Sequence, residues 1–157
     1  MPFDGSVILD KSVPFTVATD CFETLLLEPT LASIRPRPIP AWRISRGPGG
    51  VRDTVAVLTR ARALIADKRR WCKRAYAVGF LGIPVSTQSI FVRRYCALGA
   101  IRRAGWELGL SVQDAGSVLE WQTRIPVPNW NDNRRRTHPE VIAEFDAAIA
   151  ALEAVPG

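Results

Sequence analysis

The residue types of a small cysteine hydrolase are present in this chain, with Cys96 as nucleophile and His138 as base. Asn131 or Asp132 would then orient the base, as the third group of such a site does. A reactive cysteine usually lies at or near a helix N-terminus. We expect Cys96 about two turns inside a helix, so the alternative is a small buried thiol beside Gly99, a glycine that permits close helix approach.

The same polar residues have simpler structural roles. His138, the only histidine, lies in the first turn of a predicted helix, where the dipole disfavours its charged form, so a solvent-facing side chain is expected. Asn131 and Asp132 favour a turn that leads the chain into that helix, and Trp130 would pack this loop onto the core. No histidine pair or acid at helical spacing indicates a metal site, and no cofactor is predicted.

Basic clusters are the most informative functional signal. Runs interleaved with Trp71 and Tyr76 suit phosphate contact and base stacking, but they equally suit a solvated face. Within the fold, Asp67, Glu140 or Glu144 would be the ion-pair partners. The ten candidate residues for binding an anion or a nucleic acid are Lys68, Arg69, Arg70, Lys73, Arg74, Arg93, Arg94, Arg134, Arg135 and Arg136.

Charge is distributed unevenly along the chain, whose formal net charge is +6. Residues 1–42 carry three basic and five acidic groups, residues 43–105 fourteen and two, and residues 106–157 four and eight. The middle therefore carries +12 between flanks of −2 and −4. Such a field indicates an anionic partner, which is nucleic acid, an acidic protein surface or the acidic C-terminal part of the chain itself.

Composition is that of a globular protein. Of the 157 residues, 47% are hydrophobic and 23% charged, which excludes the disordered and membrane-spanning classes. No apolar run reaches the roughly 18 to 20 residues that cross a bilayer, and the N-terminus does not resemble a secretory signal. We therefore expect a cytoplasmic protein without a membrane partner. Three widely spaced cysteines indicate reduced thiols, with neither a disulfide framework nor a zinc site.

The spacing of apolar residues predicts a mainly α fold, a small bundle of about four helices. A stripe from Val57 to Ile65 predicts a helix over residues 53–67. Residues 90–104 are expected to form a central helix, because their middle is apolar on every face. A shorter helix is predicted over residues 111–121.

The last helix has the clearest start signal, since Thr137 and Glu140 are spaced as a capping box ahead of an apolar stripe. Residues 76–85 mix glycine, proline and apolar side chains, which predicts an irregular or short-strand connection.

The N-terminal third has a different character. Seven of the twelve prolines precede residue 49, and their alternation in residues 35–40 predicts extended backbone. Residues 20–28 are expected to form one short helix. The chain is thus predicted to divide into an N-terminal arm, residues 1–50, and a helical core domain, residues 51–157.

Three motifs in order give the core a family resemblance. They are the sequence Arg94-Tyr95-Cys96-Ala97-Leu98-Gly99-Ala100, the triplet Trp130-Asn131-Asp132, and Arg136-Thr137-His138 followed by Glu140-Val141. The pattern resembles a family of unknown function found in bacteria and their phages, and it covers about residues 52–152. The resemblance implies a bacterial or phage-associated protein and brings no activity with it. Its signature positions in this chain are Cys96, Gly99, Trp130, Asn131, Asp132, Thr137 and Glu140.

Three functions remain open at this stage. The first is a non-enzymatic accessory or interaction protein, whose basic face contacts an acidic protein or a nucleic acid. The second is a nucleic-acid-binding protein that uses the runs at residues 68–70 and 93–94. The third is a small cysteine hydrolase that uses Cys96 and His138. The first is preferred, and oligomeric state is not indicated.

Overall fold

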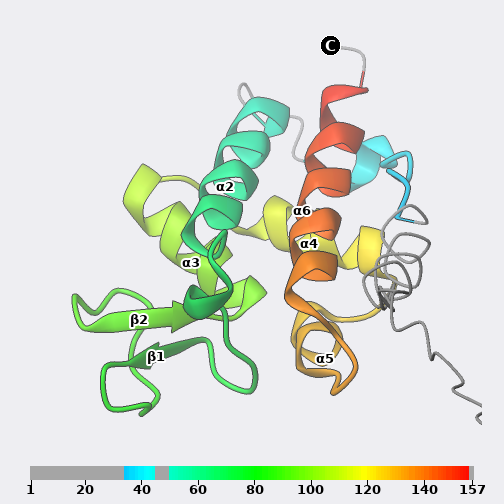
Figure 1. Ribbon diagram of the computed structural model, residues 1–157. Helices are drawn as coiled ribbons and strands as arrows, with labels where there is room; N and C mark the ends of the chain where they lie inside the picture. The colour runs from blue at the N-terminus through cyan, green and yellow to red at the C-terminus, as the bar shows by residue number, and fades with distance from the viewer. Residues whose placement is uncertain (1–33, 45–49, 156–157) are drawn as a thin grey trace, which may run out of the picture.

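The computed structural model describes residues 34–44 and 50–155. Within these ranges four longer helices form a bundle, joined by one short helix and a two-stranded sheet (Figure 1). The prediction of a mainly α fold with about four helices and short-strand connections is confirmed. No helix in the described ranges is long and apolar enough to cross a membrane. The four longer helices are α2 (Gly50–Leu64), α3 (Ala97–Leu108), α4 (Gln113–Thr123) and α6 (His138–Glu153).

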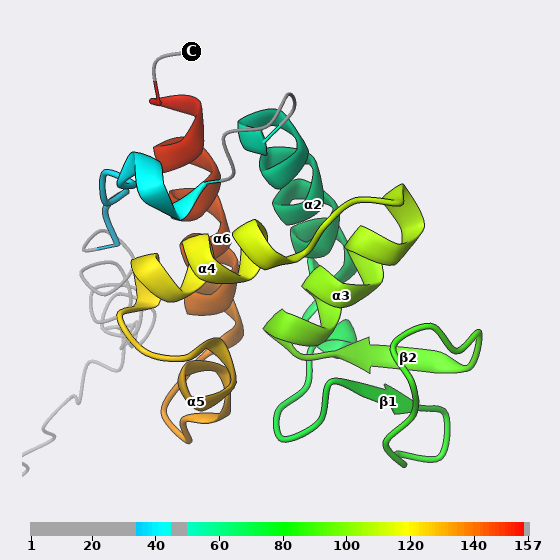
Figure 2. The ribbon, with the colours of Figure 1, turned by 180° about the vertical axis from the view of Figure 1, so that it is seen from behind.

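Helix α2 is the centre of the bundle, because it contacts α3, α4 and α6 (Figures 1 and 2). The predicted apolar stripe makes these contacts: Val57, Leu58 and Ala61 are fully buried. The helix begins and ends three residues earlier than the predicted range 53–67. Removing this stripe of side chains from water is the main favourable term for the bundle.

Helix α6 begins as the sequence predicts. The capping box forms, with the N–H of Thr137 donating to Oε2 of Glu140 at 2.8 Å. Val141 and Phe145, one turn apart, are fully buried against the bundle.

The region from residue 76 to residue 96 contains the main departure from prediction. Strands β1 (Ala77–Gly79) and β2 (Val92–Tyr95) pair antiparallel, so the helix predicted over residues 90–104 is wrong in its first part. Helix α3 begins at Ala97 instead. The physical reason is tertiary: the backbone of β2 is paired with β1, a partner that local apolar spacing cannot reveal.

The described part of the proline-rich segment packs on α4. The indole Nε1–H of Trp121 donates to the carbonyl O of Pro38, and the backbone N–H of Arg37 donates to Oε1 of Gln122. Ile39 and Ile44, on either side of the short 3-10 helix η1 (Ala41–Arg43), join the hydrophobic core. The helix predicted over residues 20–28 lies outside the described residues.

Candidate functional site

Cys96 lies at the N-cap of α3, immediately after β2, and not two turns inside a helix as predicted. Its Sγ accepts a hydrogen bond from the N–H of Gly99 at 3.3 Å, and its own N–H donates to the carbonyl O of Tyr76. The prediction was wrong because β2 pairs with β1. The backbone therefore stays extended up to Cys96, and the helix begins only at the next residue. The position is one where a helix dipole favours a thiolate.

Burial opposes that effect. The Cys96 side chain is only 4% exposed, and burial raises the pKa of its thiol although the N–H groups of Gly99 and Leu98 act to lower it. Cys72 packs in the same apolar cluster, and its pKa is raised to about 12, mainly by burial. Both cysteines are therefore neutral thiols at physiological pH, which is the form that does not attack a substrate.

His138 is buried rather than solvent-facing, so that expectation is wrong. Its Nε2–H donates to the carbonyl O of Ile65 at 2.7 Å, and its ring lies 5.9 Å, centroid to centroid, from the ring of Trp71. This arrangement ties the start of α6 to the end of α2. In the described ranges no hydrogen bond joins His138 to Cys96, so the structure does not assemble the nucleophile and base of a hydrolase.

Asn131 is the centre of the polar network around the signature motifs. It lies in the short helix α5 (Val127–Asp132) and is fully buried, so the predicted Asx-turn loop is wrong. Its Oδ1 accepts hydrogen bonds from Nε1–H of Trp71 at 2.8 Å and from the N–H of Ala97 at 3.2 Å. Its Nδ2–H group donates to the carbonyl O of Cys72 and to Oδ1 of Asp132. One amide thus fastens α5 to α3 and to the Trp71 segment.

Asp132 is committed to the same network. Its Oδ1 also accepts the backbone N–H of Arg74 at 2.8 Å, at a residue whose φ of 67° lies in the left-handed region. A non-glycine residue pays a conformational cost there, which this hydrogen bond helps to offset. Asp132 therefore shapes the loop instead of standing free as a catalytic group. No group of three or more His, Cys, Asp and Glu in the described residues could hold a metal ion.

Cys72 and Cys96 are expected to resist alkylation in the folded protein. Iodoacetamide reacts with the thiolate, whereas burial covers both groups and raises the pKa of each thiol. Peptide mass spectrometry after timed labelling should find both sites at least about a hundredfold slower than in the urea-unfolded chain. Rapid labelling of Cys96 at neutral pH would contradict its placement and revive the hydrolase alternative.

Two of the ten basic residues are used inside the fold. Nζ of Lys73 donates to the carbonyl O atoms of Asn133 and Arg136, at 2.7 and 2.8 Å, and so closes the loop after α5. The guanidinium of Arg136 lies 4.7 Å from the ring centroid of Trp130 and 3.6 Å from Oε2 of Glu140. Both cations therefore have partners within the fold, which is one of the two possibilities that the sequence left open.

The exposed cations include five that share one place in the fold. The 3-10 helix η2 (Lys68–Arg70) contacts β2, and a bridge between Trp71 and Tyr95 joins the two segments. No side chain of these five forms an ion pair with a carboxylate in the described part of the chain. We call this group the basic face: Lys68, Arg69, Arg70, Arg93 and Arg94.

The internal acids suggested by sequence do not neutralise this face. The carboxylate of Asp67 accepts the backbone N–H of Arg69 as the cap of η2, and Glu140 pairs with Arg136 and caps α6. Arg93 and Arg94 lie on an exposed strand and not in the first turn of a helix. In the described part of the chain, neither arginine has a carboxylate within ion-pair distance.

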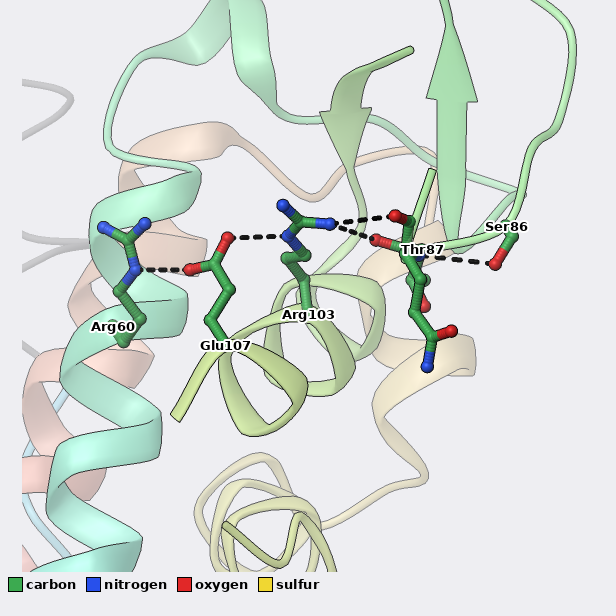
Figure 3. A network of polar contacts seen from close by, with 6 residues as sticks. Arg60, Ser86, Thr87, Arg103 and Glu107 are labelled. Carbon is green, nitrogen blue, oxygen red and sulfur yellow. Dashed lines mark hydrogen bonds and ion pairs between the residues drawn. The ribbon is translucent and has the colours of Figure 1, made fainter. Parts of the chain in front are cut away.

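Two other arginines of this chain, by contrast, pair with a carboxylate. Figure 3 shows Glu107 between two guanidinium groups, with Nε–H of Arg60 donating at 2.7 Å and Nε–H of Arg103 at 2.6 Å. Burial acts to raise the pKa of Glu107, but the hydrogen bonds from Arg60 and Arg103 hold it below its usual value. Glu107 therefore stays charged and joins α2 to α3, whereas no carboxylate of the described ranges pairs with the basic face.

Sequence reasoning missed one feature beside the basic face. Large apolar side chains are exposed in the loop between β1 and β2, among them Phe80, Ile90 and Phe91. From their apolar side chains alone, these residues would be expected to be buried or to lie in an irregular connection. The only available signal was the density of apolar residues in a segment rich in turn formers.

Comparison with known proteins gives one family. Neither the curated proteins nor the solved structures contain a match to the chain. A model of a family of unknown function, DUF6197, matches residues 51–151, which include the sheet and all of α2 after its first residue. The chain belongs to this family of unknown function, DUF6197.

Proposed function

We propose that this protein is a non-enzymatic interaction module that binds an anionic partner through the basic face. The observation that carries the proposal is that these five exposed cations have no carboxylate partner in the described ranges, whereas nearby Arg60 and Arg103 share the carboxylate of Glu107. Cations that lie close together on a surface repel one another, and a bound anionic partner relieves this electrostatic repulsion. The buried positions of Cys96 and His138 give the hydrolase alternative no support.

An acidic protein surface is the preferred partner. The two aromatic rings that would stack on bases are engaged within the fold: Trp71 donates to Asn131, and the guanidinium of Arg102 lies 4.2 Å from the ring centroid of Tyr76. Base stacking on these rings would have to displace such contacts. A cytoplasmic setting in bacteria or their phages completes the proposal, since it fits the unpaired thiols of Cys72 and Cys96.

Nucleic acid is the second candidate. From Lys68 to Trp106 the sequence has nine basic residues and no acidic one, which is the distribution that phosphate contact favours. Double-stranded and single-stranded oligonucleotides should therefore be compared with an acidic polypeptide such as polyglutamate at matched salt.

Replacing Arg69 and Arg70 together by glutamine is expected to weaken retention on heparin. Each cation that contacts a fixed anion releases counterions, so the slope of log affinity against log salt should fall by about 2. Elution over a salt gradient, followed by anisotropy titrations at several salt concentrations, measures the effect.

The matched control removes the same charge elsewhere. Arg134 and Arg135 are exposed in the loop after α5, and their joint replacement by glutamine should change the slope much less. An equal loss for both double variants would show that net charge alone governs retention, and the proposal of a specific basic face would then fail.

A further inference from the structure

Five large apolar side chains are exposed together at the tip of the β1–β2 hairpin. Their exposed fractions lie between 57% and 87%, far above those of core residues. Water-exposed clusters of this kind mark interaction sites in folded proteins. We call them the hairpin patch: Phe80, Leu81, Ile83, Ile90 and Phe91.

The patch is held in place by hydrogen bonds. The N–H of Gly79 donates to the carbonyl O of Ile83 at 2.9 Å, and the N–H of Val85 donates to the carbonyl O of Ala77 at 3.0 Å. At the other end, a guanidinium N–H of Arg103 donates to the carbonyl O atoms of Thr87 and Gln88 (Figure 3). Little ordering cost therefore remains to be met when a partner binds.

The surface is concave as well as apolar. A cavity of about 360 Å³ opens within the hairpin. Strands β1 and β2 themselves extend from the bundle on the side away from α6 (Figures 1 and 2). A hollow of this kind is filled by the apolar side chains of a partner. It is lined by Gly79, Phe80, Leu81, Ile83, Val85 and Phe91.

The patch is continuous with the basic face. The guanidinium of Arg93 lies 5.5 Å from the ring centroid of Phe80, and Arg94 follows on the same strand. No acidic residue occurs between Lys68 and Trp106, so an approaching partner meets apolar surface and positive charge together. Complementarity requires a partner that offers apolar side chains and carboxylates side by side.

We propose that the hairpin patch and the adjoining arginines bind an acidic, amphipathic segment of another protein, whose apolar side chains enter the cavity while its carboxylates face Arg93 and Arg94. The inference deepens the proposed function and rests on it for the role of the arginines. Nucleic acid offers no aliphatic surface to cover Leu81, Ile83 and Ile90. A bilayer would cover the tip but would leave the hollow without the shaped side chain that a protein supplies.

The probes for the test are fluorescein-labelled helical peptides of about 15 residues, long enough to form a helix, with leucine and phenylalanine on one face and glutamate on the other. A small set varies the spacing of the apolar residues. Saturable binding of at least one peptide to the full chain is expected by anisotropy. Phe91→Ser should weaken it about tenfold, and Leu81→Ser, a second surface variant, similarly.

Charge and position are separated by matched variants. Replacing Arg93 and Arg94 together by glutamine should weaken binding about tenfold at low salt and have little effect at high salt. The same peptide with glutamine for glutamate should lose that dependence. Ile125→Ser, at an apolar residue exposed by 43% in another part of the surface, should leave binding unchanged.

Several outcomes would overturn the inference. They are the absence of saturable binding across the set, and binding that Phe91→Ser and Leu81→Ser leave intact. Co-sedimentation with phosphatidylcholine–phosphatidylglycerol vesicles that Phe91→Ser abolishes would assign the patch to a lipid surface. Dimerisation in sedimentation velocity that Phe91→Ser abolishes would assign it to a second copy of the chain. If replacing Arg69 and Arg70 leaves heparin retention unchanged, the proposed function fails. Binding of the peptide with glutamine in place of glutamate would still test the hairpin patch by itself.

Discussion

Gly99→Ala is expected to lower the free energy of unfolding by about 3 kcal/mol, because it forces an added methyl group into tightly packed backbone. A Cβ at this position would overlap the carbonyl O of Tyr76 and lie 2.6 Å from its carbonyl carbon. That oxygen accepts the N–H of Cys96, so moving the strand segment away from α3 would break the hydrogen bond. Urea unfolding followed by circular dichroism measures the change.

Gly116 provides the matched control, since it also lies in a helix but nothing stands within 4 Å of an added Cβ. Gly116→Ala should be neutral or stabilising by up to about 1 kcal/mol, because alanine favours the helix and restricts the unfolded chain. Equal unfolding midpoints for the two variants would contradict the close approach of Tyr76 to α3.

The close approach at Gly99 was predictable, but its partner was not. A glycine next to alanines in an apolar helix indicates that another backbone comes near. The sequence led us to expect a second helix, whereas the structure places the backbone of Tyr76, the residue before β1, against Gly99. Small residues indicate that another part of the chain packs closely against the helix. Only the tertiary structure identifies which part it is.

Helices with a clean apolar period were predicted well. The apolar stripe of α2 and the capping box of α6 depend only on residues close together in the sequence, so they can be recognised without knowing the tertiary fold. Strand β2 has no such signal, because two of its four residues are arginines and its partner β1 lies across a loop, residues 80–91, without a recognisable hairpin turn. Missing it placed Cys96 inside a helix and gave Arg93 and Arg94 the wrong surroundings.

Polar residues of the signature were harder still. The short side chains of Asn131 and Asp132 fit a turn in any sequence-based reasoning, and the short helix α5 contradicts it. Burial decides the role of Asn131, because donors and acceptors from two separate segments, Trp71–Cys72 and Ala97, converge on its amide. No spacing rule along the chain relates Trp71, Ala97 and Asn131.

Asn131→Ala is expected to destabilise the protein by about 3 kcal/mol, since buried polar groups that lose their partners carry the full cost of desolvation. The substitution leaves the indole N–H of Trp71, the N–H of Ala97 and the carbonyl O of Cys72 without their present partner. It also leaves a cavity in a fully buried site. Urea unfolding measures the loss, and the tryptophan emission of the folded state, to which Trp71 contributes, should change as well.

Asn129→Ala is the control, because Asn129 lies in the same helix α5 with an exposed side chain. It should change the free energy of unfolding by less than about 0.5 kcal/mol, as surface substitutions do. Asn131→Asp separates shape from hydrogen bonding: its carboxylate can still accept from Trp71 and Ala97 but cannot donate to Cys72, and it stands beside the charge of Asp132. If Asn131→Asp is as stable as the parent chain, the donating half of the amide contributes nothing. If Asn131→Ala is also as stable, Asn131 does not fasten α5 to α3.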